Sequence, residues 1–330
     1  MTAGAPVIRL AGMALVLALA CLAALVLGDQ RLAPGAVARA LLAPGEGPAH
    51  VEIIVRGLRL PRAVLALLVG AALGVGGAVT QAILRNPLAE PGLLGINAGA
   101  ALVAVLVIVE LTAVPDSALP WLTFAGACAM SAAIWLLAWR GGSAALRVIL
   151  IGVGLSALAG AAASFVSTFG EVTAVQRAMI WMAGSLQDAR WDKVRLLALW
   201  LVLPMALAWL AARDLDVIAF GDSVARGLGQ RVDRVRLTMI LATAALSGAA
   251  VAAAGLIAFV GLAAPHIARR IVGHRHAALI PAAALCGAIL VVAADVVARR
   301  LMPPAQVPVG LMTGFLGAPF FGWLLWKARR

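Results

Sequence analysis

The sequence is poor in the residues on which most soluble enzymes depend. Only 12% of its 330 residues are charged, and tyrosine is absent. Lysine occurs only as Lys193 and Lys327, and neither follows a glycine, so the chain lacks the GxxxxGK[ST] loop that cradles nucleotide phosphates. No hydrolytic triad, cluster of catalytic groups or selectivity-filter ring is visible. These absences argue against an ATPase, a membrane enzyme and an ion channel.

Cysteine and acidic residues are also scarce. Cys21, Cys128 and Cys286 all fall inside apolar runs, so neither a disulfide nor a metal site is expected. Few ionisable residues lie deep in these runs, which disfavours a carrier driven by protons or sodium. The net charge is +12, but no aromatic-rich basic domain exists outside the apolar runs, so a nucleic-acid partner is not expected.

Apolar residues are abundant instead, at 64% of the chain, which is more than a water-soluble fold can bury. A helix that crosses a bilayer needs roughly 20 apolar residues. The runs are continuous rather than alternating, which favours helices over a barrel. The chain is therefore predicted to be an all-α integral membrane protein, a single transmembrane domain over 1–330. About ten spans are expected, at 8–28, 63–84, 93–113, 119–139, 146–168, 194–212, 235–254, 255–273, 277–298 and 309–327.

The distribution of Lys and Arg predicts the orientation. With ten spans both termini lie on one side, and the bias of basic residues favours the cytoplasmic side. The run 8–28 is long, and no small-residue cleavage site stands out before Asp29, so it is kept as the first span and not read as a signal peptide.

The longest polar stretch on the cytoplasmic side is 213–236. Asp222 and Ser223 are predicted to cap a short helix that ends near Gly227. Ala225 and Leu228 would lie on one side of this helix and Arg226 on another. An amphipathic helix outside the membrane is typical of a docking element, although an ordinary solvated loop is the alternative.

Several apolar stretches carry additional signals. The stretch 178–186 is too short to span and too apolar for an exposed loop, which predicts a half-helix dipping back toward the bilayer. Glycines four residues apart, as at Gly70 and Gly74, predict close helix packing. The run 146–168 is rich in small and hydroxyl residues, which either line a wet path or bond their own helix carbonyls. Asp295 and Arg299, four residues apart, predict a local ion pair.

A set of motifs gives the chain a family resemblance. The chain resembles the permease subunits of ABC importers for ferric siderophores, haem and cobalamin. The resemblance covers nearly the whole chain. It is carried, in the family's order, by Arg59-Leu-Pro-Arg62, Arg85-Asn-Pro-Leu-Ala-Glu-Pro-Gly-Leu-Leu-Gly95, Trp181-Met-Ala-Gly-Ser185, Phe259-Val-Gly-Leu262, Pro265-His266-Ile267 and Leu316-Gly-Ala-Pro-Phe320.

The resemblance implies a type II ABC importer permease fold and a homodimer with its pathway at the two-fold axis. Two separate ATPase subunits would dock from the cytoplasm and bind ATP-Mg, so no cofactor is expected on this chain. A periplasmic or lipid-anchored substrate-binding protein would dock from outside. The segment 213–236 would be the coupling segment, with contacts from Asp222, Ala225, Arg226, Gly227, Leu228 and Gly229. The pathway and its gates would be bordered by Ala144, Ala145, Leu146, Ser164, Ser167, Trp181 and Gly184.

Arginines on the outer side are also given a role by the resemblance. Arg59 and Arg62 are three residues apart near the expected start of the second span, and with Arg299 and Arg56 they would form an outward basic patch. The resemblance implies that acidic residues of the binding protein pair with such arginines. Lipid phosphate is the alternative partner at this interface.

The expected function is import of a ferric siderophore across the cytoplasmic membrane, driven by the ATPase subunits. Haem and cobalamin are alternative substrates, because the binding protein selects the substrate. An autonomous secondary carrier is the rival from a different class.

Overall fold

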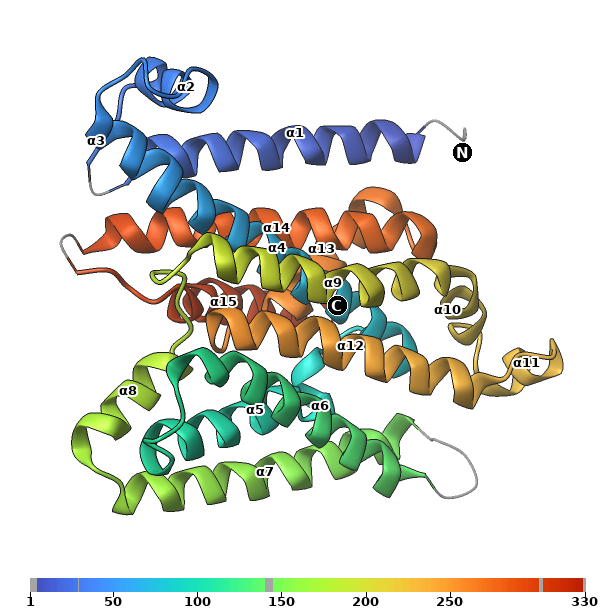
Figure 1. Cartoon of the computed structure of the whole chain (residues 1–330). Helices are drawn as coiled ribbons and strands as arrows, with labels where there is room; N and C mark the ends of the chain where they lie inside the picture. The colour runs from blue at the N-terminus through green and yellow to red at the C-terminus, as the bar shows by residue number, and fades with distance from the viewer. Residues whose placement is uncertain (1–4, 29, 140–144, 303–304, 329–330) are drawn as a thin grey trace.

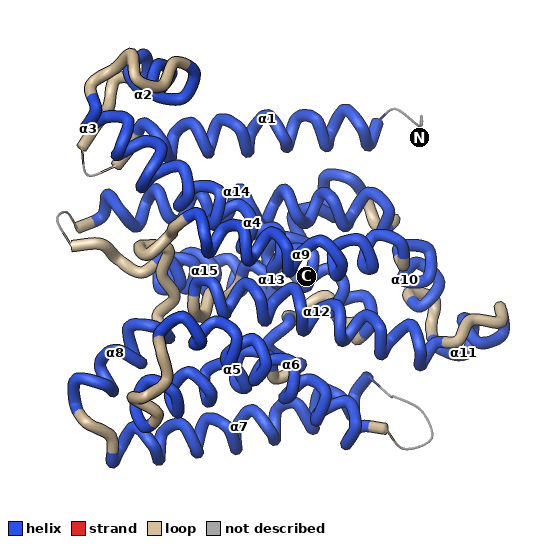
Figure 2. Tube along the Cα trace, in the orientation of Figure 1, coloured by secondary structure: helices blue, strands red, loops and turns tan. Residues whose placement is uncertain are grey.

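The protein is all-helical wherever its structure is described. A computed structural model describes residues 5–28, 30–139, 145–302 and 305–328, and in these ranges the only β pairing is an isolated bridge between Met302 and Ala305. Figure 2 shows helices joined by short loops. The all-α prediction is confirmed.

The α-helices follow one another with few long connections. They are α1 (Ala5–Val26), α2 (Pro34–Leu42), α3 (Ala49–Glu52), α4 (Leu60–Ile83), α5 (Ile96–Val105), α6 (Leu119–Ala138), α7 (Ala145–Phe169), α8 (Val172–Met182), α9 (Trp191–Leu210), α10 (Ala212–Ile218), α11 (Asp222–Gly227), α12 (Val232–Ala254), α13 (Val260–Val272), α14 (His276–Leu301) and α15 (Val309–Ala328). Two π-helical segments, η1 (Ile53–Arg59) and η3 (Leu106–Glu110), and two 3₁₀ turns, η2 (Pro91–Leu94) and η4 (Asp116–Ala118), complete the described elements.

Each of the ten predicted apolar runs coincides with a helix. In the described ranges, 7 helices are long and apolar enough to cross a membrane, while Ile96–Glu110 and Val309–Gly322 are shorter apolar helices. The remaining run, 255–273, begins with extended backbone, so α13 has only 13 residues. Gly255 was correctly predicted as a break, and its φ of 71° suits glycine. Non-helical backbone of this kind is tolerated in a membrane protein where other helices bury it.

The second span begins earlier than predicted. α3, η1 and α4 form one continuous helix over Ala49–Ile83. Arg59 and Arg62 therefore lie inside this helix and not near its start, where they were expected. Pro61 lies just past the π-helical segment η1, whose wider turn is compatible with a residue that lacks an N–H.

α4 is the central helix of the molecule (Figure 1). Glycines let neighbouring backbones approach it, as their spacing predicted. A Cβ on Gly70 would overlap the Gly287 carbonyl of α14, and a Cβ on Gly77 would overlap the Gly261 carbonyl of α13. In lipid, such close van der Waals packing replaces the hydrophobic effect as the force that joins helices.

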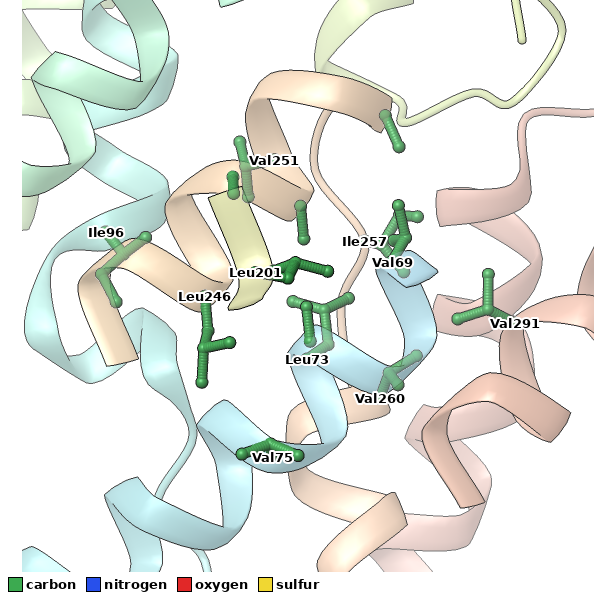
Figure 3. Close-up of a cluster of buried hydrophobic side chains, with 14 of the residues drawn as sticks. Val69, Leu73, Val75, Ile96, Leu201, Leu246, Val251, Ile257, Val260 and Val291 are labelled. Carbon is green, nitrogen blue, oxygen red and sulfur yellow. The ribbon is translucent and has the colours of Figure 1, made fainter. Parts of the chain in front are cut away.

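Apolar side chains fill the space around α4. Figure 3 shows Val69, Leu73 and Val75 of α4 among side chains from other helices, including Leu246 of α12 and Val291 of α14. The core therefore joins helices far apart in the sequence around one element.

α1 lies at one edge of the molecule and is fixed at both ends by arginines (Figure 1). Near its start, Arg9 Nη1 donates to the Ile271 carbonyl at 2.6 Å. At its end, Arg59 Nη1 donates to the carbonyls of Leu25 at 2.7 Å and Val26 at 3.0 Å. The last carbonyls of a helix have no partner within it and carry partial negative charge, so a guanidinium there both bonds them and opposes the dipole.

Candidate functional site

The predicted coupling segment lies at one end of the molecule. α10 and α11 project there, at the same end as the start of α1 (Figure 1). The structure confirms a short helix over Asp222–Gly227 followed by a break, with Gly229 at φ 82°. Residues 213–236 thus form a compact projection rather than an irregular loop.

Asp222 does not cap α11, which corrects the sequence prediction. The N-cap position belongs to Gly221, and no side chain caps the helix. Asp222 instead accepts hydrogen bonds from Arg236 Nη2 at 2.9 and 3.0 Å. The Arg236 side chain is 0% exposed, and its Nε also donates to the Ile83 carbonyl at 3.4 Å. Arg236 belongs to α12, so this pair joins α11 to α12, and the bond to Ile83 joins α12 to the end of α4.

The exposed apolar surface of this segment also differs from the prediction. Ala225 is buried against Ile218 and Val232, whereas Leu228 is 71% exposed, so Ala225 and Leu228 do not share a face. The exposed apolar side chains are Phe220, Val224 and Leu228, which we call the coupling face. Only Val224 lies within α11, because Gly221, with φ 109°, separates Phe220 from that helix.

The other predicted coupling residues are Arg226, Gly227 and Gly229, and the space around the two glycines is open. Arg226 is half-exposed and lies 3.6 Å from Asp233. A Cβ on Gly227 or Gly229 would meet nothing within 4 Å. Bulk at Gly227 would therefore be felt by a docked partner and not by the chain itself, whereas a side chain at Gly229 would strain the backbone, because φ there is 82°.

A second contact fixes the coupling segment to α14. The Asp216 carboxylate of α10 accepts the His276 backbone N–H at 2.9 Å and lies 2.6 Å from His276 Nδ1. His276 is the first residue of α14. The segment is thus attached to both central helices, α4 through Arg236 and α14 through His276.

At the opposite end, the predicted outward basic patch is largely buried. Arg59, Arg62 and Arg299 are 8%, 9% and 5% exposed, and only Arg56 remains accessible, 3.4 Å from Glu52. Arg59 reaches the end of α1 because Gly28 has no side chain to block its guanidinium. The sequence could not show this, because the partners of Arg59 lie in another helix.

Arg62 and Arg299 meet at one carboxylate. Asp295 lies 2.8 Å from Arg62 Nη2 and 3.1 Å from Arg299 Nε. The predicted pair of Asp295 with Arg299 is confirmed, but Arg62, which lies far away in the sequence, was missed. Arg59, Arg62 and Arg299 line a cavity of about 620 Å³ at this end of the molecule, together with Gln30, Gln187 and Gln306, and we call it the outer cavity after the predicted orientation.

In the predicted gate region, three glycines allow backbone segments to pack closely against one another. A Cβ on Gly184 would overlap the Leu256 carbonyl, one on Gly255 the Trp181 carbonyl, and one on Gly310 the carbonyls of Leu256 and Ala183. Ser185 N donates to Ala254 O at 2.7 Å, and Gly310 N donates to Gly184 O at 3.0 Å. The structure therefore brings Trp181 and Gly184 against the extended residues between α12 and α13.

α8 overlaps the half-helix predicted in the stretch 178–186, but it spans Val172–Met182 and so begins earlier and ends earlier than expected. Its N-cap is Glu171, whose carboxylate accepts from the N–H groups of Thr173 and Ala174 at 3.2 and 3.1 Å. Hydrogen bonds from Thr173 hold the pKa of the Glu171 carboxyl below its usual range. This cap was not predicted from the sequence.

The predicted pathway residues on α7 lie on a largely uncovered helix. Leu146 and Ser164 are exposed, and Ala145 and Ser167 are half-buried. The Ser167 hydroxyl donates to the Ala163 carbonyl of its own helix at 2.9 Å. This bond matches the alternative in which such hydroxyls bond their own helix rather than line a wet path. Ala144 lies outside the described residues.

The extended residues between α12 and α13 contact the turn between α4 and η2, which contains Glu90. Burial raises the pKa of the Glu90 carboxyl, against the opposing effect of a hydrogen bond from the Phe259 backbone N–H. Phe259 has φ 66°, which is rare for a bulky residue.

Within the described ranges, no group of three or more His, Cys, Asp or Glu side chains is placed so that it could hold a metal ion.

Comparison with known proteins gives consistent matches over almost the full length. The chain matches the model of the FecCD transport family over residues 15–327. It is 40% identical over 291 residues to FhuG, the iron(3+)-hydroxamate import system permease protein of Bacillus subtilis (strain 168), covering 86% of this chain and 87% of FhuG. It is 42% identical over 281 residues to HmuU, the hemin transport system permease protein of Yersinia pestis, covering 82% and 83%.

A solved structure shares the fold. An inward-facing metal-chelate type ABC transporter matches with a TM-score of 0.85 and 28% identity, covering 98% of this chain and 99% of that chain. The predicted fold class is therefore confirmed.

Proposed function

Because this chain belongs to the FecCD transport family of ABC importer permeases, we propose that it carries a ferric siderophore across the cytoplasmic membrane. It is a multi-pass membrane transport component rather than an enzyme, and ATP hydrolysis belongs to a separate subunit of such importers. The observation that carries the proposal is the nearly full-length match to iron-import permeases.

The proposed assembly has several parts. Two copies form a homodimer with the pathway between them, and both termini face the cytoplasm. Two ATPase subunits dock from that side and bind ATP-Mg, so this chain holds no cofactor. A substrate-binding protein docks at the outer end, and membrane lipid covers the remaining apolar surface.

A siderophore is favoured because FhuG is named for iron(3+)-hydroxamate and the solved relative for a metal chelate. HmuU, named for hemin, supports haem as the second candidate. Cobalamin is a third. The lining of the outer cavity by arginines and glutamines suits a polar partner or cargo better than an apolar one.

Reconstitution in vesicles tests the proposal. With its ATPase, its substrate-binding protein and ATP, the chain is expected to import an iron-labelled siderophore, because nucleotide binding on the partner would switch access to the pathway. The chain alone with an ion gradient should import nothing. Uptake of haem or cobalamin instead would transfer the function to that substrate, and sustained uptake by the chain alone would establish a secondary carrier.

The coupling face is the proposed ATPase contact. Tryptophan at Gly227 is expected to weaken ATPase association about tenfold or more, because a bulky side chain there obstructs docking. It should leave this chain folded, since nothing lies within 4 Å of the new Cβ. The measurement is the ATPase retained on the purified permease.

Gly57→Trp is the matched control, because Gly57 also has nothing within 4 Å and lies at the outer end. It should retain the ATPase as wild type does. Equal retention by Gly227→Trp and Gly57→Trp would place the ATPase contact elsewhere.

A further inference from the structure

Asp295 holds two arginines at once near the outer end of α14. Arg62 presents one edge of its guanidinium to it, with Nε 3.0 Å from Oδ1 and Nη2 2.8 Å from Oδ1. Arg299 Nε lies 3.1 Å from Oδ2. The Asp295 residue is only 1% exposed. Such an edge-on arrangement is the geometry by which a guanidinium recognises a carboxylate.

Two arginines share this carboxylate at the wall of the outer cavity. Arg59, Arg62 and Arg299 line this cavity of about 620 Å³, and none of the described residues that line it is acidic. Arg59 is committed to the carbonyls at the end of α1, which leaves Arg62 and Arg299 as the arginines whose partner is a carboxylate.

We propose that Asp295 is an internal competitor for the carboxylates of the substrate-binding protein, and that it limits how tightly this protein docks at the outer cavity. The inference rests on the proposed function, in which that protein docks at the outer end, and on the family resemblance, which implies that its acidic side chains meet these arginines. An approaching carboxylate finds Arg62 and Arg299 already partly neutralised, so each docking contact is weaker than with bare arginines. A partner that must leave after each delivery requires a contact of limited strength.

Gln306 offers a way to change the same balance without disturbing Asp295. Its Oε1 accepts from Arg62 Nη1 at 2.8 Å, at the edge of the guanidinium that Asp295 does not use. Glutamate in this place keeps an oxygen acceptor and adds a second competing carboxylate. It therefore acts in the opposite direction to Asp295→Asn.

The test measures the affinity of the purified substrate-binding protein for the importer in nanodiscs, at low and high salt. Asp295→Asn is expected to tighten docking about tenfold and Gln306→Glu to weaken it about tenfold, since one unit charge a few ångströms away is worth this much in a partly hydrated site. Both effects should shrink at high salt. Asp116→Asn, the same charge change at an exposed outer position, should leave docking unchanged.

The outcomes separate this inference from the function on which it rests. If Arg62→Gln does not weaken docking, the proposed docking site is wrong. If Arg62→Gln weakens docking but Gln306→Glu does not, Asp295 is not a competitor, whatever Asp295→Asn does. This second criterion matters because loss of the buried pair in Asp295→Asn can also destabilise the chain.

Discussion

Alanine at Gly77 is expected to leave little folded protein in the membrane. The new Cβ would overlap the backbone of Gly261, and neither backbone can move aside because α4 is packed against α13, α14 and α12. Overpacking of this kind costs about 1–3 kcal/mol or more, which is a large part of the stability of an ordinary domain. The measurement is the monodisperse fraction in detergent and the midpoint of thermal unfolding.

Gly160→Ala is the matched control for Gly77→Ala. Gly160 is also in a helix, but a Cβ there would meet nothing within 4 Å. It should be neutral or stabilise the chain by about 0.5–1 kcal/mol, because alanine favours a helix over glycine. Equal unfolding midpoints for the two variants would mean that α4 and α13 are not packed as described.

Alanine at Asp222 is expected to abolish ATP-driven uptake while most of the chain stays folded. The change leaves the buried Arg236 without its carboxylate. Removing one partner of a buried pair costs about 3–5 kcal/mol. The side chain of Asp222 is 22% exposed, so water reduces this cost toward its lower limit. Because the pair joins α11 to α12, its loss should loosen α11, while the contact of Asp216 with His276 still holds α10 to α14.

Hydrogen exchange of 213–236 and uptake by the reconstituted importer measure this effect. Asp192→Ala provides the comparison, since Asp192 pairs with Arg190 while both side chains are more than 60% exposed. An exposed pair contributes about 0–1 kcal/mol, so exchange and uptake should be unchanged. Slow exchange of the segment in Asp222→Ala would show that other contacts hold α11.

The positions of the helices could be predicted because each apolar run must satisfy its own backbone in lipid. Glycine spacing also predicted the close packing at Gly70, because glycines four residues apart lie on one helix face and let another backbone approach it. The break at Gly255 was found, but the extended residues after it were not. Phe259 at φ 66° contradicts local preference, and only the packing around it holds that conformation.

The candidate site was harder to predict because its charges have distant partners. Arg59 was expected to be exposed because it flanks an apolar run, whereas it bonds carbonyls of α1. Asp222 was expected to cap a short helix because of its place at the start of that helix, whereas its carboxylate accepts hydrogen bonds from Arg236. Ala225 and Leu228 were assigned to one face, which six helical residues are too few to decide.

The attachment of α1 has a consequence for biosynthesis. α1 leaves the ribosome well before Ile271 and Arg299, which bond it and lie more than 260 residues further along the chain. At about 5–20 residues per second, α1 waits tens of seconds for them. Its apolar surface must be shielded by lipid or an insertion factor throughout that interval, so α1 completes its docking only after Arg299 has been translated.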